Sequence, residues 1–193
     1  MDSALAPHQA FLNTKTFGAL DGLRAFSILS VVLYHVAETH EGLVGRLYLG
    51  VSLFFAISGF LITTLLLRER DKTGDISLKG FYARRSLRIF PLYYAVLGLY
   101  AALVFVSEKD PVVRGDFFSN LPAFLTYTSN WFVPPAADKR VIFYFAWSLA
   151  TEEQFYLLWP GVMRALRRAG AALFMTGLLA VSVWAPWAVE TQR

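Results

Sequence analysis

The sequence contains no cysteine, which excludes disulfide bonds, thiolate metal sites and a cysteine nucleophile. Only 17% of the residues are charged, whereas soluble domains usually carry about a quarter, so a soluble fold is disfavoured. No repeat, low-complexity tract or shift in composition marks a boundary, and we expect residues 1–193 to form one domain. In residues 1–20 no basic stretch precedes an apolar core, so we expect no cleavable signal there.

Apolar and aromatic residues dominate the chain instead. Hydrophobic residues make up 56% of it and aromatic residues 16%, and the mean hydropathy is +0.47. The net charge of +4 could suggest nucleic acid, but the basic residues cluster at the ends of apolar runs. That distribution is typical of oriented membrane spans, which aromatic residues also flank. We therefore predict an all-α, polytopic transmembrane helix bundle of five or six spans that binds no nucleic acid.

Four apolar runs are interpreted as spans. Leu47–Leu67 has twenty-one residues without a charge, which is long enough to cross a bilayer. The other three are Leu23–Ala37, Ile89–Val106 and Ala171–Val189. Residues 68–88, which are rich in arginine and lysine, are expected to be a polar connection between the second and third spans.

Two further apolar segments are ambiguous. Phe117–Trp131 is short and contains Pro122 and Asn130, so it could be a span, a re-entrant segment or an interfacial one. Val141–Met163 is long enough to cross, yet two adjacent glutamates lie at its centre.

The distribution of lysine and arginine predicts the orientation. Residues 68–88 hold seven basic residues and should be cytoplasmic, which places the N-terminus inside as well. Three arginines after the glutamate-containing segment should also lie inside: Arg164, Arg167 and Arg168. The stretch between these clusters must then cross an even number of times. A re-entrant or interfacial Phe117–Trp131 satisfies this condition and gives five spans, whereas six spans remain the alternative.

Arg24 and His35 lie at the two ends of the first apolar run. Their offset of eleven residues is close to three helical turns, so both project from nearly one face about 16 Å apart. His35 could be an ordinary interfacial residue. However, the only other histidines, His8 and His40, lie in polar segments, and an imidazole can exchange protons near neutral pH. His35 is therefore the candidate general base.

Glu152 and Glu153 are the most unusual charges in the sequence. Ionised groups inside a membrane are costly and normally face a cavity or a partner. Adjacent positions are about 100° apart on a helix, so the two glutamates cannot both face lipid without a large free-energy cost. Ser148, Glu152 and Tyr156 share one helical face. Alternatively, a glutamate is protonated or pairs with an arginine for stability alone.

Arg84, Arg85 and Arg88 precede the third span. The last two are three residues apart, so both guanidinium groups can converge on one polyanion, such as phosphates delivered from the cytoplasm. Alternatively, the cluster is only a positive-inside anchor.

Four blocks in this order resemble the membrane acyltransferase-3 family of bacterial O-acyltransferases: "LDGLRAFSILSVVLYH", "GVSLFFAISGFLIT", "FYARRSLRIFPLYY" and "WSLATEEQFYLLWP". The resemblance covers roughly the first 160 residues. It implies transfer of an acyl group, most often acetyl from acetyl-CoA, to hydroxyls of surface glycans or other acceptors. It also implies functional roles for Arg24, His35, Arg85 and Arg88, and for the block with Trp147, Ser148, Glu152 and Glu153.

The resemblance leads to a mechanistic hypothesis. Acyl-CoA binds from the cytoplasm at Arg85, Arg88 and Arg84, and its thioester passes Arg24. His35 deprotonates the acceptor hydroxyl or itself accepts the acyl group. Glu152 or Glu153 orients His35 or balances its charge. Trp147, Ser148 and Tyr156 are the expected substrate-binding residues. No metal or resident cofactor is required.

Two expectations accompany this hypothesis. The protein should lie in the bacterial inner membrane. Family members usually have about ten spans, so this chain is expected to be truncated relative to them and could need partner helices. The rival functions are a proton-coupled transporter and a non-catalytic membrane fragment.

Overall fold

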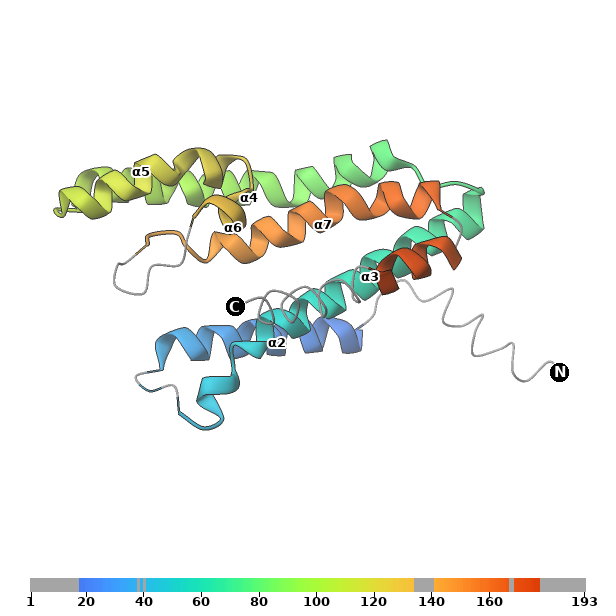
Figure 1. The fold of residues 1–193 in the computed structure, drawn as a ribbon, viewed down its shortest axis with the longest axis horizontal. Helices are drawn as coiled ribbons and strands as arrows, with labels where there is room; N and C mark the ends of the chain where they lie inside the picture. The colour runs from blue at the N-terminus through green and yellow to red at the C-terminus, as the bar shows by residue number, and fades with distance from the viewer. Residues whose placement is uncertain (1–17, 38, 40, 134–140, 167–168, 178–193) are drawn as a thin grey trace, which may run out of the picture. The chain divides into compact units, whose positions relative to one another are not determined.

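The computed structural model describes residues 18–37, 39, 41–133, 141–166 and 169–177 (Figure 1). The elements named within them are all helices, as predicted. In chain order they are α2 (Gly18–Val36), the 3-10 helix η2 (Val44–Arg46), α3 (Leu49–Thr73), α4 (Leu78–Ser107), α5 (Pro111–Leu125), α6 (Ser129–Phe132) and α7 (Ala146–Ala165). They belong to two compact units, Met1–Gly74 and Asp75–Arg193.

Three of the expected spans are confirmed as helices of sufficient length and apolarity to cross a membrane. They are Gly18–Val36, Val44–Thr73 and Leu78–Ser107. Many large apolar side chains on these helices are exposed, for example Phe26, Leu92 and Val106, as expected for surfaces that contact lipid. The late apolar run Ala171–Val189 lies largely outside the described residues.

Most of the predicted polar connection over residues 68–88 is helical, and the turn within it is short. α3 continues through its charged end to Thr73, and α4 begins at Leu78. Arginine, lysine and glutamate are good helix formers, so charge alone does not end a helix. The turn is confined to the residues between. Gly74 adopts φ 82°, and the Ser77 hydroxyl accepts a hydrogen bond from the Gly80 amide at 3.2 Å.

Close packing of α2 against α3 builds the first unit. Gly50 lies where the helices meet, and a Cβ atom there would be 2.6 Å from the Ser27 carbonyl oxygen. Ser27 and Ser30 are buried on α2, and their hydroxyls donate to backbone carbonyls of the preceding turn at 2.8 and 2.9 Å. Small residues with internally satisfied hydroxyls therefore let the two backbones approach each other.

In the second unit α5 returns only part of the way along α4. The hydroxyls of Tyr93 and Tyr94, in the middle of α4, donate to the Phe124 and Leu125 carbonyls at the end of α5, at 2.7 and 3.0 Å. A turn then leads to the four-residue helix α6. Phe117–Trp131 is therefore no continuous spanning helix, in agreement with the expectation of a re-entrant or interfacial segment.

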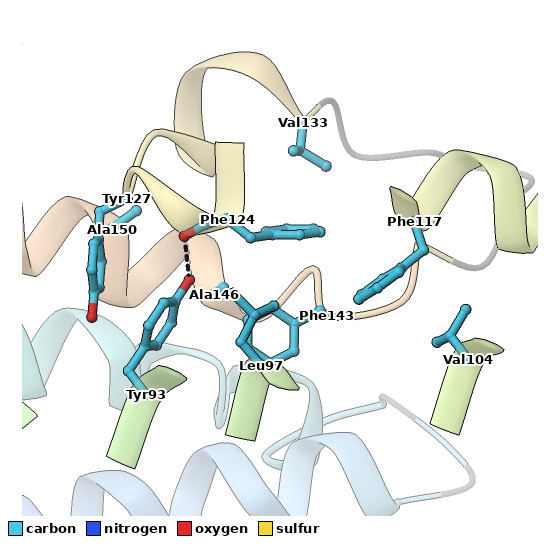
Figure 2. Packing of buried hydrophobic residues seen from close by; sticks show 10 residues of the cluster. All are labelled: Tyr93, Leu97, Val104, Phe117, Phe124, Tyr127, Val133, Phe143, Ala146 and Ala150. Carbon is cyan, nitrogen blue, oxygen red and sulfur yellow. Dashed lines mark hydrogen bonds between the residues drawn. The ribbon is translucent and has the colours of Figure 1, made fainter. Parts of the chain in front are cut away.

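Buried side chains from α4, α5, α7 and the connecting segments form the core of this unit (Figure 2). Its centre is aromatic: the rings of Tyr93 and Tyr127 stack at 4.3 Å between centroids, and Phe143 packs edge-on to Phe124 at 5.3 Å. This core fixes the end of α5 against both α4 and α7, and thereby positions the turn at Tyr127.

The segment predicted as Val141–Met163 begins with a turn and becomes the helix α7 only at Ala146. The turn contains Phe143 at φ 66°. Glu152 and Glu153 lie near the middle of α7, as predicted, and α7 is not among the helices that qualify as spans by length and apolarity alone.

Candidate functional site

α4 and α7 run antiparallel, and polar contacts fix their register. Arg164 Nη2, near the end of α7, lies 2.7 Å from Asp75 Oδ2, just before α4. Further along α4, the Tyr82 hydroxyl donates to the Leu157 carbonyl at 2.7 Å. The end of α7 therefore lies beside the start of α4. The predicted even number of membrane crossings between residues 68–88 and the arginines from Arg164 onward requires both clusters to lie on the same side of the membrane. This arrangement of α4 and α7 meets that requirement.

The next contact in this register is an ion cluster. Arg85 Nη2 lies 3.5 Å from Glu152 Oε1, and Arg85 Nε lies 3.9 Å from Glu153 Oε1. The guanidinium carbon is 3.4 Å from the centroid of the Tyr156 ring, and the Tyr156 hydroxyl donates to Glu152 Oε1. The side chains of Arg85, Glu152 and Glu153 are only 17%, 9% and 11% exposed, so these charges are largely removed from solvent.

The two glutamates are not equivalent within this cluster. Glu152 contacts both the Arg85 guanidinium and the Tyr156 hydroxyl. Glu153 Oε1 is buried and accepts no hydrogen bond from the described residues, and neither does Arg85 Nε make one. A buried charged atom without a hydrogen bond is costly. Glu152 therefore holds the arginine, whereas Glu153 retains hydrogen-bonding capacity.

Glu153 also lines a cleft of about 530 Å³. The walls combine aromatic side chains with a few polar ones: Tyr82, Arg85, Ser86, Phe90, Thr126, Tyr127, Thr128, Trp131, Glu153, Gln154, Tyr156 and Leu157. Gln154 braces one wall, because its amide donates to the Tyr127 carbonyl at 2.8 Å and exchanges two hydrogen bonds with Asn130. A cleft of this size and lining is typical of a small-molecule site.

In the first unit, Arg24 and His35 both lie on the continuous helix α2, so their predicted spacing holds. The Arg24 guanidinium lies 5.2 Å from the centroid of the Phe54 ring. His35 is exposed, and its Nδ1 lies 2.8 Å from the Val31 carbonyl oxygen. A carbonyl can only accept, so Nδ1 carries the hydrogen and the neutral ring keeps its lone pair on Nε2.

The remaining predicted site residues occupy other surroundings. Arg84 and Arg88 are exposed on α4, and Arg88 forms no ion pair with a described residue. On α7, Trp147 is half-buried and the Ser148 hydroxyl donates to the Phe145 carbonyl at 3.0 Å. The second unit therefore brings together Arg85, Glu152, Glu153 and Tyr156. The other predicted residues of this unit lie outside that cluster: Arg84, Arg88, Trp147 and Ser148.

Among the cleft residues that the sequence did not single out are Tyr82, Tyr127 and Gln154, whose hydrogen bonds connect the walls of the cleft. Tyr82 and Gln154 lie inside the recognised blocks, next to the residues that were selected, but their partners are distant in sequence. Tyr127 lies in a turn at φ 53°, which an aromatic residue seldom adopts. In the part of the chain that the structure describes, no three histidine or carboxylate side chains are grouped as metal ligands.

The profile of a family described as "Acyltransferase domain", the acyltransferase-3 family, matches residues 17–190. The chain belongs to the acyltransferase-3 family. This match confirms the resemblance and covers all described residues of both units.

Individual relatives of this acyltransferase-3 chain have informative names. A Staphylococcus aureus (strain COL) protein named "Putative O-acetyltransferase" is 38% identical over 154 residues, which are 76% of this chain and 24% of the relative. Peptidoglycan O-acetyltransferase OatA of Listeria monocytogenes is 33% identical over 161 residues, 75% of this chain and 24% of the relative. The chain thus spans about a quarter of the length of these relatives. A comparison with solved structures finds no match.

Proposed function

We propose that this protein is an integral-membrane O-acyltransferase. It moves an acyl group, with acetyl as the favoured case, from acyl-CoA to a hydroxyl of a cell-surface glycan. The family match, the spanning helices and the O-acetyltransferase names of the relatives support this function. The observation that carries it furthest in this chain is the hydrogen bond from His35 Nδ1 to the Val31 carbonyl, because it directs the ring's lone pair to Nε2.

The proposed reaction uses Nε2 of His35 as general base. Nε2 removes the proton of the acceptor hydroxyl, and the oxygen attacks the thioester carbonyl carbon. The carbon–sulfur bond then breaks, and the imidazolium gives its proton to the departing CoA thiolate. In a two-step variant Nε2 itself attacks the thioester carbonyl carbon, and the carbon–sulfur bond breaks to give an acyl-imidazolium and the CoA thiolate. The acceptor hydroxyl then attacks the acyl carbon, the carbon–nitrogen bond breaks, and the hydroxyl proton passes through the imidazole to the thiolate.

The arginines are proposed to bind the donor. Arg84 and Arg88 are both exposed and are proposed to contact the phosphates of acyl-CoA, because guanidinium groups suit phosphate oxygens. Arg85 is held by Glu152 and Glu153, so it contributes a fixed positive charge beside these two arginines. Arg24 is proposed to guide the thioester along α2, and Trp147 and Ser148 to contact substrate.

The location is part of the same proposal. We place the protein in the bacterial inner membrane, with its N-terminus and the arginine-rich end of α4 in the cytoplasm, where acyl-CoA is made. Lysine and arginine density favours this orientation.

The test is acyl transfer by the full-length protein in lipid nanodiscs. His35→Ala should lower the transfer rate by ~10²–10⁴-fold, the usual effect of losing a general base. His35→Gln preserves a hydrogen-bonding side chain but cannot cycle a proton, so it should fail similarly. Binding of CoA should persist in both variants.

The matched control is His40→Ala, five residues away in the sequence and outside the described residues, which should remain active. Transfer by His35→Gln above about a tenth of the wild-type rate, well outside the range for a lost base, would show that His35 is structural.

A further inference from the structure

The cleft between α4, α6 and α7 contains polar groups that the fold itself does not satisfy. Glu153 lines it, and its buried Oε1 accepts no hydrogen bond from a described residue. Tyr127 is only 8% exposed, and its hydroxyl has no hydrogen-bond partner among those residues. Buried polar groups are normally paired, so each of these two points to an additional group.

The backbone at Tyr127 adds an independent observation. Its φ of 53° is uncommon for an aromatic residue. The Gln154 amide, bonded to the Tyr127 carbonyl at 2.8 Å, holds this conformation in place. The Phe90 ring stacks on Tyr127 at 5.6 Å. Strained conformations held by their surroundings are frequent in ligand sites, and Tyr127 is one of the residues that line the cleft.

The charges around the cleft restrict what can enter. Glu153 disfavours an anion at this wall. A cation is also disfavoured, since Arg85 already lies 3.9 Å from Glu153, and Arg84 and Arg88 are on the same turns of α4. An uncharged group that donates a hydrogen bond to the carboxylate fits best. The aromatic walls, which include Trp131, favour a ligand with an apolar face.

We propose that this cleft binds an uncharged, hydroxyl-bearing part of a substrate. The ligand hydroxyl donates to Glu153, a second polar group of the ligand pairs with the Tyr127 hydroxyl, and its apolar face lies on Trp131. Glu152 with Tyr156 positions Arg85 behind the site. This inference rests on the proposed acyl transfer, which has two substrates with such a group: the pantetheine arm of the donor and the sugar ring of the acceptor.

The test is tryptophan fluorescence of the full-length protein in nanodiscs during titration with two probes. One probe is pantetheine and the other is methyl N-acetyl-β-glucosaminide. We expect one probe to change the fluorescence, and the change to disappear in Trp131→Phe. Glu153→Gln should raise the Kd of that probe about tenfold or more, since hydrogen bonds to charged groups are the stronger ones.

Two further variants separate binding from folding. Asp116→Asn, exposed on α5 and outside the cleft, should leave the Kd unchanged. Tyr127→Phe removes only the unpaired hydroxyl and should weaken binding while the melting temperature is maintained, which keeps the proposal testable if Glu153→Gln does not fold.

The source of the ligand follows from which probe binds. Saturable binding of pantetheine alone assigns the cleft to the donor, and binding of the glycoside alone assigns it to the acceptor. Failure of both probes at millimolar concentration, or an unchanged Kd in a folded Glu153→Gln protein, overturns the proposal. Transfer that still depends on His35 would then leave the proposed function standing without this cleft.

Discussion

Replacing Arg85 with alanine is expected to destabilise the second unit far more than loss of a surface charge would. Arg85 is the cation within ion-pair distance of Glu152 and Glu153 among the described residues, and these carboxylates are only 9% and 11% exposed. Breaking a buried ion pair by removing one partner typically costs about 3–5 kcal/mol, because the remaining charge stays buried. The contact with the Tyr156 ring adds about 0.5–2 kcal/mol, so Arg85→Lys should recover only part of the loss.

The measurement is thermal unfolding of the purified protein in a mild detergent. Arg88→Ala is the matched control, because it removes the same side chain from an exposed position one turn away. Glu152→Gln should partly rescue Arg85→Ala, since it removes one of the stranded charges, with a coupling of about 0.5–3 kcal/mol in the double-mutant cycle. Equal melting temperatures for Arg85→Ala and Arg88→Ala, or strictly additive effects, would refute the ion-cluster interpretation.

Three more outcomes are expected. Gly50→Ala should cost about 1–3 kcal/mol in thermal stability, because its Cβ would lie 2.6 Å from a carbonyl oxygen of α2, whereas Gly98→Ala, with open space around it, should be tolerated. A reporter fused after Lys79 should behave as cytoplasmic and one after Lys109 as external; the reverse pattern would invert the proposed orientation. Arg88→Ala should weaken CoA binding with little change in stability, and unchanged affinity would reduce this arginine to a topological anchor.

The first three spans were predictable because their signal is local. An uninterrupted apolar run such as Leu47–Leu67 must be helical in a bilayer, where every backbone group needs an internal partner. The helix ends were not predictable in the same way. α3 and α4 extend into the basic segment over residues 68–88 because charged residues with long side chains are compatible with helix, and only Gly74 and Ser77 mark the turn.

The sequence predicted that the candidate site contains buried charges, but not which residues pair with each other. The cost of charge in a membrane indicated that Glu152 and Glu153 need a partner. Its identity depends on the register of α4 against α7, which brings Arg85 within reach from 67 positions earlier in the chain. No spacing rule within one helix reveals that distance. Tyr127 was missed because its role depends on a rare backbone conformation and on Gln154, also far away in sequence.

The surroundings of Arg85 and Arg88 imply that two arginines of one motif perform different tasks. A spacing of three residues places both on a similar side of α4, so the sequence permits one shared polyanion. In the structure Arg85 faces two carboxylates and an aromatic ring, whereas Arg88 is exposed. A phosphate at Arg85 would have to displace Glu152 or Glu153 and leave it buried without a partner, which is costly. Arg88 is exposed, so a phosphate there would break no ion pair with a described residue. The motif therefore combines an inward residue that fixes α7 against α4 with an outward residue that is available to an anion, and loss of either should give a distinct phenotype.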